Sequence, residues 1–323
     1  MEENKKNIFI AGHNGMVGSA LHRLLKNVSN VNLITKNRNE LDLCNQNDVK
    51  NFFYSNEIDE VYIAAGLVGG INANDNKPAN FIYENTMINV NVIHYAYMSG
   101  VKKLMALGSS CIYPKYSKQP INEEDLMTGS LERTNEFYGI AKITALKLCE
   151  SYRRQYKVDF RSAMPTNLYG IGDNYNPSDS HVIPGLIRKF HEAKIKKKES
   201  VEIWGTGSPI REFLYVDDLA SALIEVMNIS YDNYNEITNE NNRHINIGSG
   251  LTIAIKDLAL RIKKIIGFNG HLIFDESKPD GTPIKIINSE KFYNFFKWQP
   301  SMSLEDGLKL SYNDFIKRYS KKD

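Results

Sequence analysis

The sequence has few cysteines, almost no excess charge and no long apolar run. Its three cysteines, Cys44, Cys111 and Cys149, are odd in number and widely spaced, which favours a reducing compartment over a disulfide framework. The formal charge is +2, from 40 basic and 38 acidic residues, so we expect no general attraction to nucleic acid or to an anionic membrane. No segment approaches the ~20 apolar residues of a membrane span, and the N-terminus lacks the layout of a signal peptide. These features predict a cytoplasmic protein, and no metal site is expected.

The 323 residues do contain a regular alternation of apolar strand patterns and amphipathic helix patterns. Strands are predicted at residues 7–11, 31–34, 60–64, 103–107, 160–164 and 244–247. Helices are predicted at residues 16–26, 48–55, 79–97, 136–156 and 216–227. The alternation predicts an α/β fold with a doubly wound parallel sheet of the Rossmann type.

Beyond Gly170 the pattern becomes irregular and is punctuated by glycine and proline, which predicts a smaller C-terminal α/β domain that binds substrate. The asparagine-rich stretch 228–242 is expected to be a surface loop. The expected division is a dinucleotide-binding domain at 1–170, to which 216–248 returns, and a substrate domain formed by 171–215 and 249–323.

A glycine-rich turn lies between the first predicted strand and the first predicted helix. Its glycines allow a tight turn and a close approach of the backbone, and the helix N-terminus presents free amides to a pyrophosphate. The residues of this turn that we expect to contact a dinucleotide are Gly12, Asn14, Gly15, Met16, Val17 and Gly18.

The second strand is followed by Thr35-Lys36-Asn37-Arg38, which has no acidic residue to bind the ribose hydroxyls of NAD. Arg38 stands twenty residues after Gly18, and a guanidinium suits a 2′-phosphate. The sequence therefore favours NADP(H) as the cofactor. The alternative is that Arg38 is a solvated surface arginine.

Tyr138 and Lys142 are four residues apart in a predicted helix, so their side chains share one face. An ammonium near a phenol favours the phenolate, and we expect it to lower the pKa of Tyr138. Ser109 would supply a second hydroxyl, so that Ser109 and Tyr138 together bind a carbonyl oxygen. Tyr138 would then protonate the alkoxide as hydride arrives at carbon. The pattern predicts a ketone reductase.

These residues lie within longer motifs at 10–20, 107–115, 164–170, 180–184, 204–213 and 277–283. By these motifs the chain resembles the extended short-chain dehydrogenase/reductase family, and within it the GDP-L-fucose synthases, nearly end to end. The resemblance implies an NADPH-dependent 3,5-epimerisation of GDP-4-keto-6-deoxy-D-mannose, followed by reduction of its C4 ketone to give GDP-L-fucose. It also implies a homodimer that pairs the helices around 79–97 and 136–156.

By the same resemblance, Cys111 and His181 match the two acid/base groups that invert C3 and C5. A ketone at C4 acidifies the hydrogens on both of these carbons, and cysteine and histidine both exchange protons near neutrality. The positions that match further cofactor contacts are Arg38, Leu107, Lys142, Pro165, Asn167, Leu168 and His181. Those that match substrate contacts are Ser109, Ser110, Lys189, Trp204, Arg211 and Asp280.

Gly139 beside Tyr138, and Ile171-Gly172 after Gly170, depart from the family pattern and would leave room for a bulkier ring substituent. A C4 reductase without epimerase activity, acting on a related GDP-4-keto-6-deoxy sugar such as a heptose, therefore remains an alternative. An alternative of another class is a dinucleotide-sensing binding protein without catalysis. The intact Ser109, Tyr138 and Lys142 argue against this last alternative, because a sensor needs no proton donor.

Overall fold

The computed structural model describes residues 5–278 and 280–319, so Pro279 of the 277–283 motif lies outside the described residues. The largest element is a six-stranded sheet of order β2-β1-β3-β4-β5-β9, in which every neighbouring pair is parallel. Its strands are β1 (Lys6–Ala11), β2 (Val31–Ile34), β3 (Glu60–Ile63), β4 (Lys103–Leu107), β5 (Asp159–Pro165) and β9 (Ile245–Ile247).

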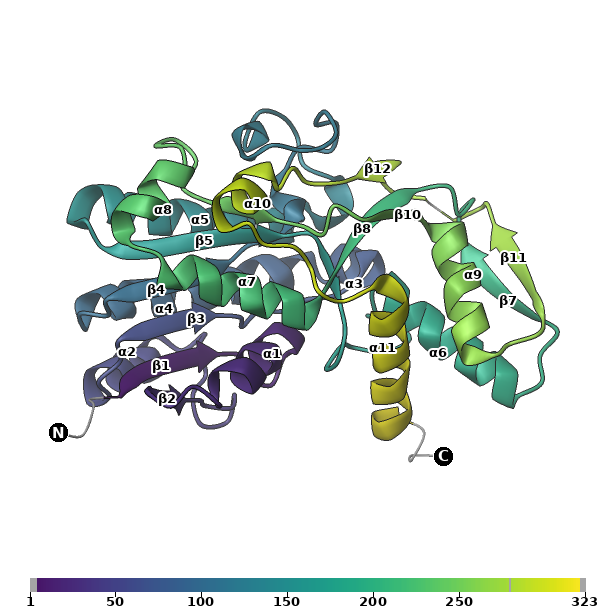
Figure 1. Ribbon diagram of the computed structural model, residues 1–323, viewed down its shortest axis with the longest axis horizontal. Helices are drawn as coiled ribbons and strands as arrows, with labels where there is room; N and C mark the ends of the chain where they lie inside the picture. Colours follow the sequence, from purple (N-terminus) through teal and green to yellow (C-terminus); the bar gives the residue numbers. More distant parts are fainter. Residues whose placement is uncertain (1–4, 279, 320–323) are drawn as a thin grey trace.

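Helices cover both faces of this sheet (Figure 1). The helices α1 (Met16–Leu25) and α7 (Val216–Asn228) share a buried apolar cluster with one face, and α2 (Gln46–Ser55), α4 (Pro78–Met98) and α5 (Glu136–Tyr156) share another with the opposite face. A parallel sheet that is buried on both faces needs apolar side chains on both, which explains the continuous apolar runs of its central strands. The predicted doubly wound sheet is confirmed. We call this sheet and its helices the first lobe.

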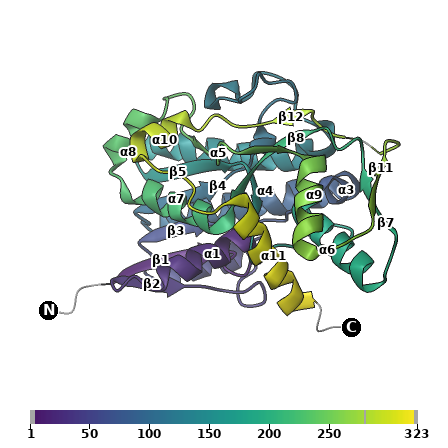
Figure 2. The ribbon, with the colours of Figure 1, turned by 45° about the vertical axis from the view of Figure 1, so that its right-hand side comes forward.

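A second lobe has its own apolar core. Its strands are β6 (Asn167–Tyr169), β8 (Ile210–Tyr215), β10 (Thr252–Ala254) and β12 (Ile284–Lys285) in one mixed sheet, and β7 (Ser200–Trp204) and β11 (His271–Asp275) in a parallel pair. Its helices are α6 (Val182–Ile195), α9 (Ile255–Ile266) and α11 (Leu304–Tyr319). Figure 2 shows α6 and α9 beside the β7–β11 pair. The chain passes from β8 directly into α7, so the two lobes are joined more than once.

The expectation of a loop over 228–242 is wrong in its middle, where α8 (Tyr231–Ile237) forms. The Ser230 side chain caps this helix by accepting a hydrogen bond from the Asn233 amide at 3.1 Å. Tyr234 is fully buried, and its hydroxyl donates to the Ser162 carbonyl of β5 at 3.1 Å. The contact between Tyr234 and Ser162 joins residues that are distant in sequence. The local asparagine-rich composition therefore does not reveal the helix.

The remaining short helices are α3 (Ile71–Asn76), before α4, and α10 (Glu290–Phe296), which follows β12. Cys44, Cys111 and Cys149 are all free thiols, and Cys149 is buried in the first lobe. Over the described part of the chain, no helix combines the length and apolarity needed to cross a bilayer. Nor do the described residues contain a group of three or more His, Cys, Asp or Glu side chains placed to hold a metal ion.

Candidate active site

The glycine turn after β1 is shaped by close backbone contacts. Gly12 has a φ of 86°, and a Cβ on it would lie 2.6 Å from the Cα of Ala65, which follows β3. A Cβ on Gly18 would overlap the Gly12 carbonyl oxygen. Gly15 stands at the N-cap of α1 and has no side chain to cover the helix amides. The turn lies where β1 adjoins both β2 and β3, the switch point of the sheet, and its open amides fit a dinucleotide pyrophosphate.

Arg38 lies on the surface near this turn and is 72% exposed on its side chain. Its Nη2 is 3.3 Å from Oε2 of Glu84 on α4. An exposed ion pair of this kind contributes little free energy, so an anionic ligand can compete for the guanidinium. A 2′-phosphate contact at Arg38 stays a prediction.

Tyr138 and Lys142 lie one turn apart at the start of α5 and are both buried. The Lys142 ammonium donates to the Leu107 carbonyl at the end of β4 over 2.9 Å, and it lies 5.7 Å from the centre of the Tyr138 ring. Burial lowers the pKa of Lys142 to about 8. Burial, and then the Cys111 thiol, raise the pKa of Tyr138, while a hydrogen bond with Ser109 lowers it. The expected lowering of the tyrosine pKa by Lys142 is therefore wrong, because burial dominates the pKa of the phenol while the ammonium donates to the Leu107 carbonyl.

Ser109 and Cys111 meet Tyr138 in a short turn after β4. The Ser109 hydroxyl caps the 3₁₀ turn Ser110–Ile112 by accepting a hydrogen bond from the Cys111 amide at 3.3 Å. Ser109 and Cys111 both influence the Tyr138 phenol, the first as a hydrogen-bond partner and the second by its charge. Ser110 itself is buried. The structure thus brings two hydroxyls and a thiol to one place.

The two glycine departures do not leave space beside a sugar. A Cβ on Gly139 would lie 2.8 Å from the Cys111 carbonyl oxygen and 3.0 Å from Cδ1 of Leu131. Gly172 has a φ of 89° and faces Ser19 and Met16 of the dinucleotide turn. The inference that these glycines enlarge a sugar pocket is wrong, because protein atoms already fill the space in front of each.

His181 is the N-cap residue of α6, in the second lobe. The residue has exposed surface, but nearby protein atoms partly desolvate the imidazole, and this desolvation lowers its pKa. The charge of Lys285 lowers the pKa further. His181 is therefore in electrostatic contact with the group that also lies beside Cys111.

Two residues at the Cys111 sulfur were not predicted from the sequence. The Asn135 side-chain amide lies 3.3 Å from Sγ, and the Lys285 ammonium lies 3.4 Å from it. Asn135 precedes Tyr138 by three residues, and this spacing could have placed its side chain near Tyr138. Lys285 follows the 277–283 motif by two residues, but only the fold shows that it reaches Cys111.

The predicted nucleotide contacts gather in the second lobe. The Lys189 ammonium lies 5.6 Å from the centre of the half-exposed Trp204 ring, and Lys278 lies 5.8 Å from it. Burial lowers the pKa of Lys189 and of Arg211. Asp280 accepts from the Thr206 amide and hydroxyl, each at 2.8 Å, so both of its oxygens hold the turn after β7. Contacts of these residues with a substrate remain predictions.

The other predicted cofactor residues follow the ends of β4 and β5. Leu107 and Pro165 close these neighbouring strands, and the carboxyl ends of parallel strands are where such sheets bind ligands. The Asn167 amide donates to the Glu212 carbonyl at 2.9 Å. Leu168 packs against the core of the first lobe. These residues are placed near the site, and their contacts with a cofactor are untested.

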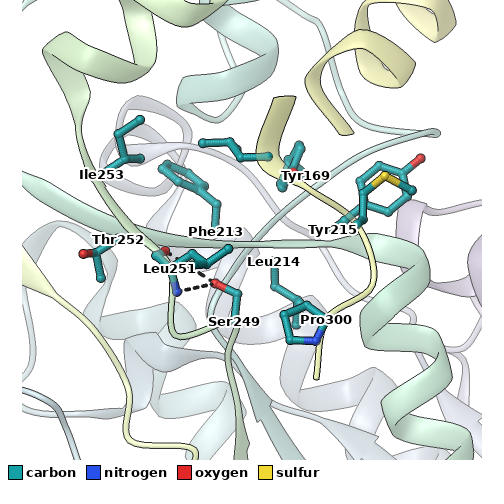
Figure 3. A pocket seen from close by; sticks show the side chains of 11 residues that line it. Tyr169, Phe213, Leu214, Tyr215, Ser249, Leu251, Thr252, Ile253 and Pro300 are labelled. Carbon is teal, nitrogen blue, oxygen red and sulfur yellow. Dashed lines mark hydrogen bonds between the residues drawn. The ribbon is translucent and has the colours of Figure 1, made fainter. Parts of the chain in front are cut away.

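The cavity drawn in Figure 3 is separate from this arrangement. It measures about 30 Å³ and lies among Tyr169, Phe213 and Ile253 of the second lobe, where the Leu251 amide donates to the Ser249 hydroxyl at 3.1 Å. That volume holds about two water molecules. It is too small for a dinucleotide or a nucleotide sugar, so we assign it no ligand.

Residues 8–248 match the sequence model of the NAD dependent epimerase/dehydratase family. A GDP-L-fucose synthase from Escherichia coli (strain K12) is 51% identical over 313 residues, which is 97% of each chain. The chain belongs to the NAD dependent epimerase/dehydratase family. Its resemblance to the GDP-L-fucose synthases of that family is confirmed.

Solved structures of epimerase/dehydratase family members agree with this fold. A GDP-6-OMe-4-keto-L-xylo-heptose reductase from C. jejuni superposes with a TM-score of 0.92 at 38% identity, covering 98% of this chain and 99% of that one. A GDP-L-fucose synthetase from Naegleria fowleri bound to NADP superposes with a TM-score of 0.87 at 27% identity, covering 98% and 95%. The solved structures similar to this chain thus include one named for a heptose substrate and one named for GDP-L-fucose.

Proposed function

We propose that this protein converts GDP-4-keto-6-deoxy-D-mannose to GDP-L-fucose, by epimerisation at C3 and C5 and then NADPH-dependent reduction at C4. The observation that carries the proposal is the meeting of the Cys111 thiol with Ser109 and Tyr138. A reductase needs the two hydroxyls, and an epimerase also needs a group that exchanges protons beside them. The 51% identity to a GDP-L-fucose synthase over nearly the whole chain supports the same substrate.

NADPH would be held by the glycine turn, with Arg38 at its 2′-phosphate, and it supplies the hydride for C4. The open amides at Gly15 and the close packing of Gly12 and Gly18 fit its pyrophosphate. Lys142 lies where the end of β4 meets the start of α5, and its charge would stabilise the phenolate that remains when Tyr138 gives up its proton. The chain itself would thus orient the cofactor and supply a proton from the Tyr138 oxygen.

In epimerisation, Ser109 and Tyr138 would hold the C4 oxygen while a proton leaves C3 or C5. The electrons of the broken C–H bond move into an enolate, whose oxygen these two donors stabilise. Cys111 and His181 would exchange the proton on opposite faces of the ring. In reduction the same oxygen becomes an alkoxide, and Tyr138 protonates it. The raised pKa of Tyr138 suits this role, because the phenol stays protonated at neutral pH.

We assign the nucleotide end of the substrate to the second lobe. Lys189 and Arg211 would bind the diphosphate, Trp204 would offer its ring to the base, and Asp280 would hold the neighbouring turn and contact a hydroxyl. The half-exposed ring of Trp204 and the short distance to Lys189 support this placement. In this division 1–170 and 216–248 serve the dinucleotide, and 171–215 and 249–323 serve the GDP sugar.

We further propose a homodimer formed by α4 and α5, in the cytoplasm. These two helices pack side by side and expose large apolar side chains, namely Tyr83, Met98, Phe137, Ile140 and Tyr156. Such side chains on neighbouring helices favour an interface between copies. The three free thiols support a reducing compartment. Sedimentation equilibrium tests the dimer, with Tyr83→Glu and Ile140→Glu expected to give monomers.

The test of the reaction is the mass of the product formed from GDP-4-keto-6-deoxy-D-mannose and NADPH in deuterated water. Two solvent deuteriums retained on carbon, together with reduction, are expected. Reduction without deuterium would instead identify a C4 reductase, and the 38% identity to a heptose reductase makes GDP-4-keto-6-deoxyheptoses the next substrates to test. If the protein bound the cofactor but turned over neither sugar, the hypothesis of a non-catalytic dinucleotide-sensing protein would be favoured.

A further inference from the structure

Two nitrogen donors from distant parts of the chain converge on the Cys111 sulfur. The neutral Asn135 amide lies 3.3 Å from Sγ, and the Lys285 ammonium lies 3.4 Å from it. Lys285 forms no ion pair with any residue in the ranges 5–278 and 280–319. The partly buried Lys285 ammonium donates a hydrogen bond to the Cys111 sulfur.

The backbone on either side of Lys285 is held in place. Lys285 lies in β12, paired in register with Arg211 of β8. The next residue, Ile286, accepts from the Ile121 amide at 2.9 Å and donates to Oε1 of Gln119 at 2.8 Å. These two bonds tie the end of β12 to the segment that follows the Cys111 turn. The second lobe thus delivers a fixed cation to a thiol of the first.

We propose that Lys285 is a positioning residue that keeps Cys111 as the thiolate, the form that removes a proton from the sugar. This inference rests on the proposed function, in which Cys111 exchanges a proton beside the C4 ketone. A cation within ~4–6 Å favours the charged form of a thiol, whereas the Asn135 amide adds a hydrogen bond without charge. The thiolate takes the proton, and the C–H electron pair moves to the C4 oxygen held by Ser109 and Tyr138.

The same ammonium acts in the opposite sense on His181. It attracts a negative charge on Cys111 but repels a positive charge on His181, whose pKa is lowered first by desolvation and then by Lys285. The groups that face Cys111 also include the Tyr138 phenol, which is uncharged when buried. One cation therefore makes the two acid/base groups unequal. It favours the charged form of Cys111, which acts as the base, and the neutral form of His181.

The test measures how fast iodoacetamide alkylates Cys111 in the full-length protein across pH, followed by the mass of the Cys111 peptide. We expect Lys285→Met to slow alkylation at neutral pH by about tenfold or more, and to move the midpoint of the rate profile to higher pH. Lys285→Gln should do the same. Lys285→Arg, which keeps the charge, should retain most of the wild-type rate.

Two references make the result specific. Cys44 in the same molecules reports general changes in thiol reactivity and should not respond. Lys278→Met removes a charge from the same part of the chain without facing the sulfur, and should leave the Cys111 profile unchanged. Unaltered alkylation in both Lys285→Met and Lys285→Gln would overturn the inference, as would an equal loss in Lys278→Met. Deuterium incorporation by the wild type is measured separately, so failure of the proposed function is seen independently.

Discussion

The residues that we propose for reduction and those that we propose for epimerisation are placed in different ways. Ser109, Tyr138 and Lys142 all belong to the first lobe, where the end of β4 meets the start of α5, and the last two are buried. Cys111, by contrast, is half-exposed and meets Lys285 of the second lobe, which also acts on His181. In the proposed mechanism, reduction would thus depend on packing within one lobe, whereas epimerisation would depend on contacts between two.

This difference predicts that each half of the reaction can be removed by itself. Substitutions within the first lobe should affect hydride transfer most. Substitutions at the contacts between lobes should affect solvent exchange at C3 and C5 most.

Tyr138→Phe should have the largest effect, because it removes the proton donor and one of the two donors to the C4 oxygen. We expect kcat/KM for NADPH oxidation to fall by about 10⁴-fold, at the upper end for general acid catalysis. Binding of NADPH, followed by its fluorescence, should be unchanged. Tyr54→Phe, at an exposed position on α2, is the matched control. Turnover by Tyr138→Phe near the wild-type rate would contradict the proposed mechanism.

Cys111→Ala should remove solvent exchange and spare the reduction machinery. We expect deuterium incorporation at C3 and C5 to fall by roughly 10²- to 10³-fold, because the proton-exchanging group is gone. Melting temperature and NADPH binding should stay close to wild type. Cys44→Ser tests for a general effect of losing a thiol and should exchange normally. Full deuterium incorporation by Cys111→Ala would assign epimerisation to another residue.

We expect Lys142 to make reduction depend on pH. Because burial lowers its pKa to about 8, the ammonium is present below that pH and is lost as the pH rises through it. We expect kcat/KM for reduction to fall by about tenfold per pH unit above 8. Lys142→Arg stays charged and should lose this alkaline limb, whatever its absolute rate. A wild-type profile that stays flat to pH 10 would show that the charge is not required.

The two regions also differ in how far the sequence predicts them. The glycine turn and the Tyr138–Lys142 pair are local patterns with a fixed spacing, and both form on the elements expected. The contact of Lys285 with Cys111 spans 174 residues and arises only when β12 pairs with β8. A single sequence carries no spacing signal for such a contact.

The direction of the tyrosine pKa shift could not be predicted either, for a different reason. The spacing places Lys142 near Tyr138, but it does not say how deeply both are buried. Burial raises the pKa of the phenol and lowers that of the ammonium, because each loses the water that solvates its charged form. The reason for Gly139 could not be predicted either, because its missing side chain makes room for the Cys111 backbone, a contact that the spacing does not reveal.

Arg38→Ser should have the smallest effect and tests the edge of the first lobe. Arg38 is exposed and its ion pair with Glu84 is weak, so the loss should leave stability unchanged. The substitution would nevertheless remove one charge-assisted contact to a 2′-phosphate. We therefore expect the KM for NADPH to rise by about tenfold, while the KM for NADH stays unchanged. Lys36→Ser, an exchange of the other cation in the same loop, is the matched control. If both variants leave the preference for NADPH intact, backbone amides or another side chain must read the phosphate, and Arg38 would be a surface residue.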